Sequence, residues 1–156
     1  MSFLIKVEHI NPFIVSNMET FKKMLGLEAK PGKAMLKINS KLDYDVSGVI
    51  GLSGKLLGSV AMSFPEKSAL ALCNKFMSSE FKDMNEDILD AVGELVNIVA
   101  GNAKKGLSEF DIEISLPNVI LGHNHRSVEP RGALAFILRF ATYLGDFHMA
   151  VSLKST

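Results

Sequence analysis

The sequence has little of several features that would assign a protein class at once. Its 156 residues include a single cysteine, Cys73, which excludes an internal disulfide and is typical of a reducing compartment. Seventeen basic and seventeen acidic side chains cancel, so no net field draws the chain to nucleic acid or to an anionic membrane surface. These counts therefore predict that the protein binds neither nucleic acid nor a membrane.

Long hydrophobic runs are also absent from the chain. No window approaches the roughly 18 uninterrupted apolar residues of a membrane span. The first fifteen residues are partly apolar, but Lys6, Glu8 and Asn11 interrupt them, and no small-residue cleavage site follows. We therefore expect a soluble, cytoplasmic protein.

The side-chain groupings of common covalent and metal catalysts are missing too. No serine–histidine or cysteine–histidine constellation can be identified by its spacing. Cys73 lies in "SALALCNKFM", where a buried helical thiol is expected. His123 and His125 in "GHNHR" have the spacing of two metal ligands on a strand, but without a third ligand a polar loop is the simpler interpretation.

The composition that remains is that of one globular domain over residues 1–156. Hydrophobic residues make up 47% of the chain and charged residues 22%, and this length suffices to bury a substantial core. Helices are predicted from Asn11 to about Gly26, from Pro65 through "EKSALALCNKFMSS", and from about Asn85 to Gly106. Strands are predicted in "KAMLKINS", in "DVSGVIGLSGKLLGSVAMSF" around a Ser53–Gly54 turn, in "DIEISLPNVILG" with a bend at Pro117, and in "ALAFILRFATYLGDFHMAVSLK" around Gly145–Asp146.

This order of elements predicts an α+β fold. We expect long helices packed on a six-stranded, largely antiparallel sheet, built from two pseudo-repeated halves of a helix plus three strands with one helix between them. The sequence carries a faint echo, because "ETFKKMLG" (Glu19–Gly26) and "ELVNIVAG" (Glu94–Gly101) share Glu and Gly at matching offsets, with Lys22 where the second copy has Asn97. In the last predicted hairpin, the side chains on both faces of the strands are apolar. This predicts that the hairpin lies either at the centre of the sheet or at a subunit interface, and it favours a dimer.

The third predicted helix has an unusual polar side. At 100° per residue, Asp90, Glu94, Asn97 and Gly101 follow i, i+4, i+7 and i+11 along the side opposite the apolar face, with Gly93 beside them. A glycine inside a helix costs about 1 kcal/mol relative to alanine. Glycines that border a carboxylate and a carboxamide allow another backbone to approach closely. A helix face that is simply exposed to solvent and has no function would also carry polar residues, but it would ordinarily have alanine or lysine in place of glycine.

The chemistry available to this face is positioning rather than covalent catalysis. The carboxamide of Asn97 offers a donor and an acceptor and can orient a water molecule, whereas the carboxylate of Glu94 can pair with a lysine of a partner. Orientation of water for attack on a phosphoryl group is the role that a carboxamide has in GTPases. The pattern therefore predicts a surface that is applied to another protein.

At this point the residues resemble a known family. The pattern Asp90-x-x-x-Glu94-x-x-Asn97, with Gly101 and Pro117 downstream, is similar to the signature of the CheC/CheX/FliY phosphatases of bacterial and archaeal chemotaxis. The stretches "NPFIVSNMETFKKMLG", "SGKLLGSVAMSF" and "SLPNVILG" extend the resemblance over nearly the whole chain, and the single intact motif looks most like CheX-type members. In the signature of that family, the proline lies a few residues further from the Asn than Pro117 lies from Asn97. A shorter turn between helix and strand in this chain would explain the difference.

The resemblance implies an enzyme that dephosphorylates the phospho-aspartate of a CheY-type response regulator in two-component chemotaxis signalling. Glu94 would contact a lysine of the regulator, and Asn97 would position the attacking water. Four further residues would support the docking face: Asp90, Gly93, Gly101 and Pro117. The Mg²⁺ ion belongs to the regulator, so no metal or cofactor of the chain's own is expected. CheX-type members are homodimers, and because Lys22 replaces the Asn in the first helix, one active face per subunit is expected.

Two alternatives stay open at the level of the sequence. A dimeric module that docks a response regulator, or a flagellar or signalling partner, without hydrolysis would present a similar surface, although it would not need both Glu94 and Asn97. The second alternative is a two-component output domain that works with a separate receiver.

Overall fold

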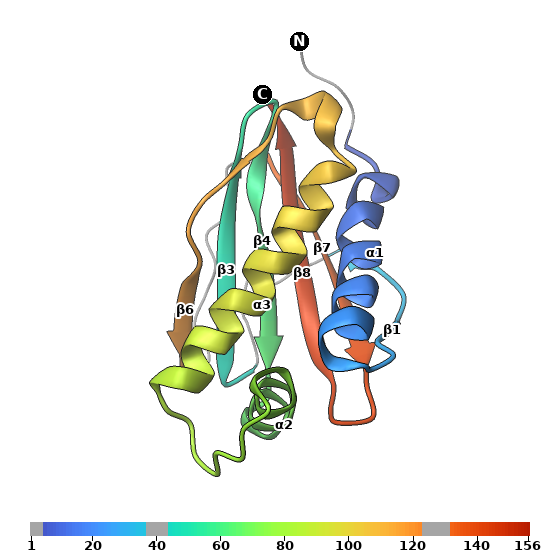
Figure 1. Cartoon of the computed structure of the whole chain (residues 1–156). Helices are drawn as coiled ribbons and strands as arrows, with labels where there is room; N and C mark the ends of the chain where they lie inside the picture. The colour runs from blue at the N-terminus through green and yellow to red at the C-terminus, as the bar shows by residue number, and fades with distance from the viewer. Residues whose placement is uncertain (1–4, 37–43, 123–131) are drawn as a thin grey trace.

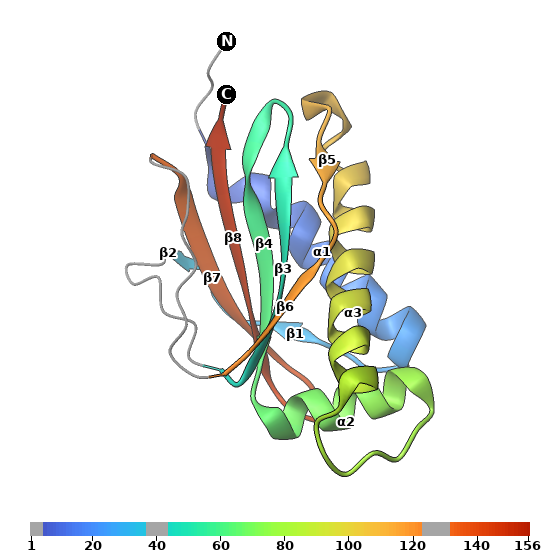
Figure 2. The same ribbon diagram turned by 90° about the vertical axis from the view of Figure 1, so that its left-hand side faces the viewer.

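The computed structural model describes residues 5–36, 44–122 and 132–156 (Figure 1). The helices are α1 (Asn11–Thr20), α2 (Glu66–Met77) and α3 (Glu86–Lys105), with short turns η1 (Val7–Ile10), η2 (Phe21–Leu25) and η3 (Ser108–Phe110). The strands are β1 (Lys30–Pro31), β2 (Met35–Leu36), β3 (Val46–Ser53), β4 (Leu56–Phe64), β5 (Glu113–Ile114), β6 (Asn118–Leu121), β7 (Leu134–Ala141) and β8 (Phe147–Ser155). Helices α1 and α3 cover one face of a single sheet, and α2 lies at the lower end of the sheet in this view, below α3 (Figure 2).

The sheet confirms the predicted α+β class. Its order is β1-β7-β8-β4-β3-β5, with β2 also beside β7 and β6 also beside β3, and every pair in the described residues is antiparallel. The prediction of six strands differs in its count, because β1 was not predicted and the segment "DIEISLPNVILG" forms two strands, β5 and β6. The predicted strand in "KAMLKINS" begins as β2, and its residues 37–40 lie outside the described part of the chain.

The pairing of the strands supports the predicted repeat. The first half contributes β2, β3 and β4, and the second contributes β6, β7 and β8. Each half forms its own hairpin, β3–β4 or β7–β8, whereas its first strand pairs with the hairpin of the other half: β2 with β7, and β6 with β3. The two halves meet at the antiparallel pair β4–β8, so β8 lies centrally, one of the two positions predicted for the last hairpin.

The helices repeat the same pattern of burial. Ser16, Asn17 and Thr20 on α1 are buried, and so are Ala91, Val92 and Leu95, which lie 75 positions later on α3. This is the offset that aligns "ETFKKMLG" with "ELVNIVAG". The two helices therefore turn equivalent positions toward the core, although their outer faces differ: Met18 is exposed, whereas Gly93, 75 positions later, is buried.

The core lies between the sheet and the helices. Alternate residues of β8, Phe147, Met149, Val151 and Leu153, are fully buried, as period-two alternation requires of a strand with one covered face. The Phe147 ring stacks on three other rings, with centroids 4.8 Å from Phe21, 5.2 Å from Phe64 and 5.1 Å from Phe140. These contacts tie η2, β4 and β7 to the central strand.

Cys73 is buried on α2, as predicted. Burial away from water raises the pKa of its thiol to about 12, because the thiolate would be desolvated. A thiolate nucleophile at this position is therefore excluded near neutral pH.

None of the helices in the described residues is long and apolar enough to cross a membrane.

Candidate functional site

Helix α3 crosses the helical face of the sheet beside α1 (Figure 1), and side-chain hydrogen bonds fix its N-terminal end. The Asn85 side chain caps the first turn by accepting a hydrogen bond from the Ile88 N–H at 2.9 Å. The loop from α2 to α3 is organised by Asn74, whose amide donates to the Phe81 carbonyl at 2.8 Å and whose side-chain oxygen accepts from the Phe81 N–H at 2.9 Å. The predicted helix from Asn85 to Gly106 is thus confirmed.

One face of α3 is anchored in the core. Its fully or almost fully buried apolar residues are Ile88, Ala91, Val92, Leu95, Val96, Val99, Ala100 and Ala103. The Ser16 hydroxyl of α1 donates a hydrogen bond to the Val99 carbonyl at 2.7 Å, which fixes the two helices relative to one another. Ile98 is only half-buried. With its inner face held in this way, the outer face of α3 is a rigid surface.

The predicted line of functional residues lies on that outer face. Asp90 and Glu94 are exposed, and Asn97 is half-buried rather than fully exposed. No hydrogen bond or ion pair within the described residues engages the side chains of Glu94 or Asn97. The two residues are three positions apart, about 4.5 Å along the helix axis, and project side by side. Their polar atoms are available to a partner.

Gly93 does not lie on the open surface as predicted. It is buried, and a Cβ built there would lie 3.3 Å from Val119 Cγ2 and 3.5 Å from Pro117 Cγ. The segment that covers it belongs to the same chain. The absence of a side chain at Gly93 therefore allows β6 to approach α3, and this contact explains the helical cost of that glycine without any partner.

A β-bulge between β5 and β6 brings Pro117 against Gly93. Leu52 of β3 pairs with Ile114 and Val49 pairs with Asn118, so three residues of the β5–β6 segment stand opposite two of β3. Within the bulge the Ser115 side chain replaces a backbone acceptor, because its hydroxyl oxygen accepts from the Gly51 N–H at 2.8 Å. Proline, which has no N–H to give to a ladder, is compatible with this position. The predicted bend at Pro117 is confirmed.

Gly101 differs from Gly93. A Cβ built on Gly101 would meet nothing within 4 Å, so nothing in the described chain requires a glycine there. The residue lines an open depression of about 570 Å³. The other residues that line this depression are Lys104, Lys105, Ser108, Asp111, Ile112 and Glu113. We call it the Gly101 groove; its lining was not predicted, because the segment that follows α3 returns beside the helix only in three dimensions.

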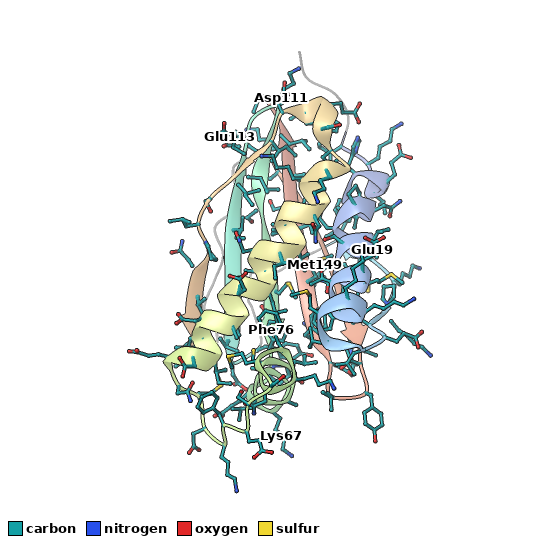
Figure 3. The ribbon with its side chains drawn as sticks, viewed as in Figure 1. Glu19, Lys67, Phe76, Asp111, Glu113 and Met149 are labelled. Atoms are coloured by element: carbon teal, nitrogen blue, oxygen red, sulfur yellow. The ribbon has the colours of Figure 1, made fainter. Side chains whose placement is uncertain are left out.

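A larger depression, of about 760 Å³, lies on α1 instead of α3. It is lined by Glu19 and Lys22, which occupy the positions of Glu94 and Asn97 in the repeat. Figure 3 shows Glu19 on α1, next to α3. A lysine ammonium has donors but no acceptor, so Lys22 is unable to accept a hydrogen bond from an attacking water as a carboxamide can. Size therefore does not identify the chemical site, and the residue types favour α3.

In residues 5–36, 44–122 and 132–156, no group of three or more His, Cys, Asp or Glu side chains is arranged to hold a metal ion. His123 and His125, for which a polar loop was the simpler interpretation, lie outside these ranges.

The family of the chain follows from comparison with known proteins. Residues 46–141, more than half of the chain, match the family described as chemotaxis phosphatase CheX. The chain belongs to the CheX family. The matched range contains α3 with Glu94 and Asn97, and also the bulge at Pro117.

Individual relatives are similar to this chain over nearly its full length, which supports this assignment. The CheY-P phosphatase CheX of Thermotoga maritima is 29% identical over 149 residues, which cover 94% of this chain and 96% of that protein. The crystal structure of a CheC-like superfamily protein from Shewanella sp. PV-4 is 32% identical and has a TM-score of 0.87, with 97% of this chain and 100% of that one covered.

A third relative was solved together with a partner. The CheX of Borrelia burgdorferi, in a complex of CheX, CheY, BeF3 and Mg²⁺, is 25% identical and has a TM-score of 0.81, with 96% of this chain and 100% of that one covered. The fold and the family therefore agree with the resemblance that the motif on α3 indicated.

Proposed function

We propose that this chain is a phosphatase that removes the phosphoryl group from the phospho-aspartate of a CheY-type response-regulator receiver domain. The observation that carries the proposal is the pair Glu94 and Asn97, side by side on the outer face of a rigid helix with no partner in the described residues. Two relatives support the choice of substrate, because one is named a CheY-P phosphatase and the other was solved in complex with CheY.

In this proposal Asn97 is the catalytic residue. Its carboxamide enters the partner's phosphorylation site and holds a water molecule in line with the phosphorus atom. The water oxygen forms a bond to phosphorus while the bond from phosphorus to the aspartate oxygen breaks, which releases the aspartate and inorganic phosphate. The Mg²⁺ ion is carried by the receiver, and this chain contributes no metal and no nucleophile. Catalysis then consists of positioning.

Glu94 holds the partner in register. Its exposed carboxylate lies about one helical turn from Asn97 and pairs with a lysine of the receiver. Asp90 lies one turn further toward the N-terminus and adds negative charge at the same end of the surface. Pro117 acts indirectly, because its contact with Gly93 fixes the bulge against α3 one turn from Asn97.

The decay of a phosphorylated CheY-type receiver with Mg²⁺ present tests the proposal. The native protein should accelerate decay, and Asn97→Ala should lower kcat by about 100-fold, the typical loss when one oriented polar group is removed. Asn102→Ala is the matched control, because Asn102 is an exposed asparagine of the same helix that lies off the line of the motif. Glu94→Lys should chiefly raise KM.

Each other outcome has a defined meaning. Equal decay with the native protein and with Asn97→Ala would contradict the catalytic role of Asn97. Measurable binding of the receiver without any acceleration would favour the alternative of a non-catalytic docking module. Loss of folding in Asn97→Ala, detected by circular dichroism, would show that the residue is structural.

The homodimer and the cytoplasmic location are parts of this proposal. Exposed apolar side chains at β2, Met35 and Leu36, together with Leu134 at the start of the neighbouring β7, support a dimer because they leave apolar surface for a second subunit. Light scattering after size-exclusion chromatography would give the mass directly. The single cysteine supports a reducing compartment.

A further inference from the structure

The charges on the outer side of α3 are ordered along its axis. The first half carries the carboxylates of Glu86, Asp87, Asp90 and Glu94, and the last turn carries Lys104 and Lys105. Lys104 is seven residues beyond Asn97, so it lies within about 20° of the same line and about 10 Å further along the axis. The proposed catalytic amide thus lies between a negative and a positive end.

The Gly101 groove adjoins the positive end of this line. Gly101 itself is four residues beyond Asn97 and leaves the helix surface open at the point between the amide and the lysines. The opposite wall is formed by the segment that follows α3, where Figure 3 shows Asp111 and Glu113. Asp111 forms an ion pair with Lys55, with 3.5 Å between Oδ2 and Nζ. Glu113 is also exposed on that wall, so the groove has carboxylates on one side and the two lysines of the helix on the other.

We propose that Lys104 and Lys105, together with the Gly101 groove, bind an acidic surface segment of the receiver and so set the direction in which the receiver docks on α3. This inference rests on the proposed function. It assigns to the last turn of the helix a part in recognition that the motif residues alone do not supply.

The charges along this line of α3 would be complementary to a partner that has a cation at one end of its contact surface and carboxylates at the other. With the receiver's cation against Glu94 and an acidic segment against Lys104 and Lys105, both ends of α3 attract the partner. A receiver turned end for end would place its acidic segment against the carboxylates of Asp90 and Glu94, where like charges repel. The unoccupied Cβ position of Gly101 lets the acidic segment come close to the helix backbone. Only one direction then brings the phosphoryl group to Asn97.

A simpler role for the lysines has to be separated from this one. Cations in the last turn of any helix interact favourably with the helix dipole. Lys75 provides the matched control, because it is an exposed lysine in the last turn of α2 and has no place in the line on α3. Reversal of one lysine in the last turn of either helix should lower Tm by a similar small amount, whereas only the α3 lysines should affect binding of the partner.

The test compares the variant Lys104→Glu/Lys105→Glu with Lys75→Glu in dephosphorylation of a phosphorylated CheY-type receiver. We expect KM to rise about tenfold or more for the α3 variant at low ionic strength, with kcat within about twofold of native and the difference shrinking as salt screens the charges. Lys75→Glu should keep the native KM. An unchanged KM and salt dependence in the α3 variant would overturn the inference, as would a fall in kcat alone.

Binding measurements separate this inference from the proposed function. The affinity of the same variants for the receiver activated with BeF3 and Mg²⁺ is measured without any turnover. If the native protein bound but did not hydrolyse, the proposed function would fail, and a loss of affinity in the α3 variant alone would still support docking through the lysines. Equal affinity of all three proteins would overturn the docking role.

The groove can be tested independently of charge. Gly101→Leu fills the groove, whereas Asn102→Leu places the same side chain on the next residue of the helix, away from the line. We expect Gly101→Leu to weaken binding of the activated receiver about tenfold and Asn102→Leu to leave it unchanged. Equal effects of the two substitutions would contradict a contact at Gly101.

Discussion

At the scale of single residues, the two glycines of α3 have different causes. Gly93 is required by its own chain, because β6 and Pro117 pack against it. Gly101 has open space at its Cβ position, and no part of the described chain fills that space. The helical pattern places both glycines near the polar side, but it carries no information about which of them a neighbouring strand covers.

Replacement of the two glycines by alanine should therefore have unequal effects. Gly101→Ala should raise the free energy of unfolding by about 0.5–1 kcal/mol, because alanine is the better helix former and its Cβ meets nothing. In Gly93→Ala the gain in propensity is opposed by the contact with Val119 Cγ2 at 3.3 Å. Urea denaturation of both variants checks this, and a Gly93→Ala protein as stable as Gly101→Ala would contradict the difference.

The alignment of the site residues along one side of α3, in contrast, could be predicted from the sequence. The line Asp90, Glu94, Asn97 and Gly101 depends only on the 100° step of a helix, and the structure keeps it on the outer face. The partial burial of Asn97 and the lining of the Gly101 groove depend on the path of the chain after α3, for which no local signal exists.

At the scale of elements, α3 illustrates why helix ends are predictable. Its cap is a contact over three residues, from the Asn85 side chain to the Ile88 N–H, so the sequence alone contains it. The bulge at Ser115–Pro117 is different, because it exists only in the register of the β5–β6 segment against β3, more than sixty positions away in the chain. A proline in the segment indicates an irregularity, but not how many residues the bulge contains.

Removal of the cap tests the element directly. Asn85→Ala should lower the free energy of unfolding by about 1 kcal/mol, because the first-turn N–H of Ile88 loses its acceptor. Asn102→Ala, an asparagine of the same helix outside the cap, should have no comparable effect. Equal midpoints of chemical denaturation for the two variants would show that the cap contributes nothing to stability.

At the scale of the whole molecule, the repeat organises the sheet. The order of the predicted elements indicated two halves, and the Glu and Gly that the two helices share at matching offsets agreed with it. It did not predict that each half places its first strand in the other half's hairpin, since strand order is a property of long-range pairing.

Cys73 reports on the integrity of this whole. Its thiol is fully buried and its pKa is raised to about 12, so an aromatic disulfide reagent at about pH 8 should label the protein only when it unfolds. Rapid labelling without denaturant would contradict this. Above about pH 9 the thiol ionises only in the unfolded chain, so the free energy of unfolding should fall with rising pH relative to Cys73→Ala.

The central position of β8 also bears on the order of events during synthesis. The β3–β4 hairpin emerges from the ribosome early, yet one edge of β4 stays open until residues 147–155 arrive to pair with it. Leu56 pairs with Ser155, which lies 99 residues later in the chain. Contacts this distant close slowly, so the nascent protein carries an unprotected apolar strand for most of its translation. Chaperones that shield exposed strands therefore have a long opportunity to act on this chain at β4.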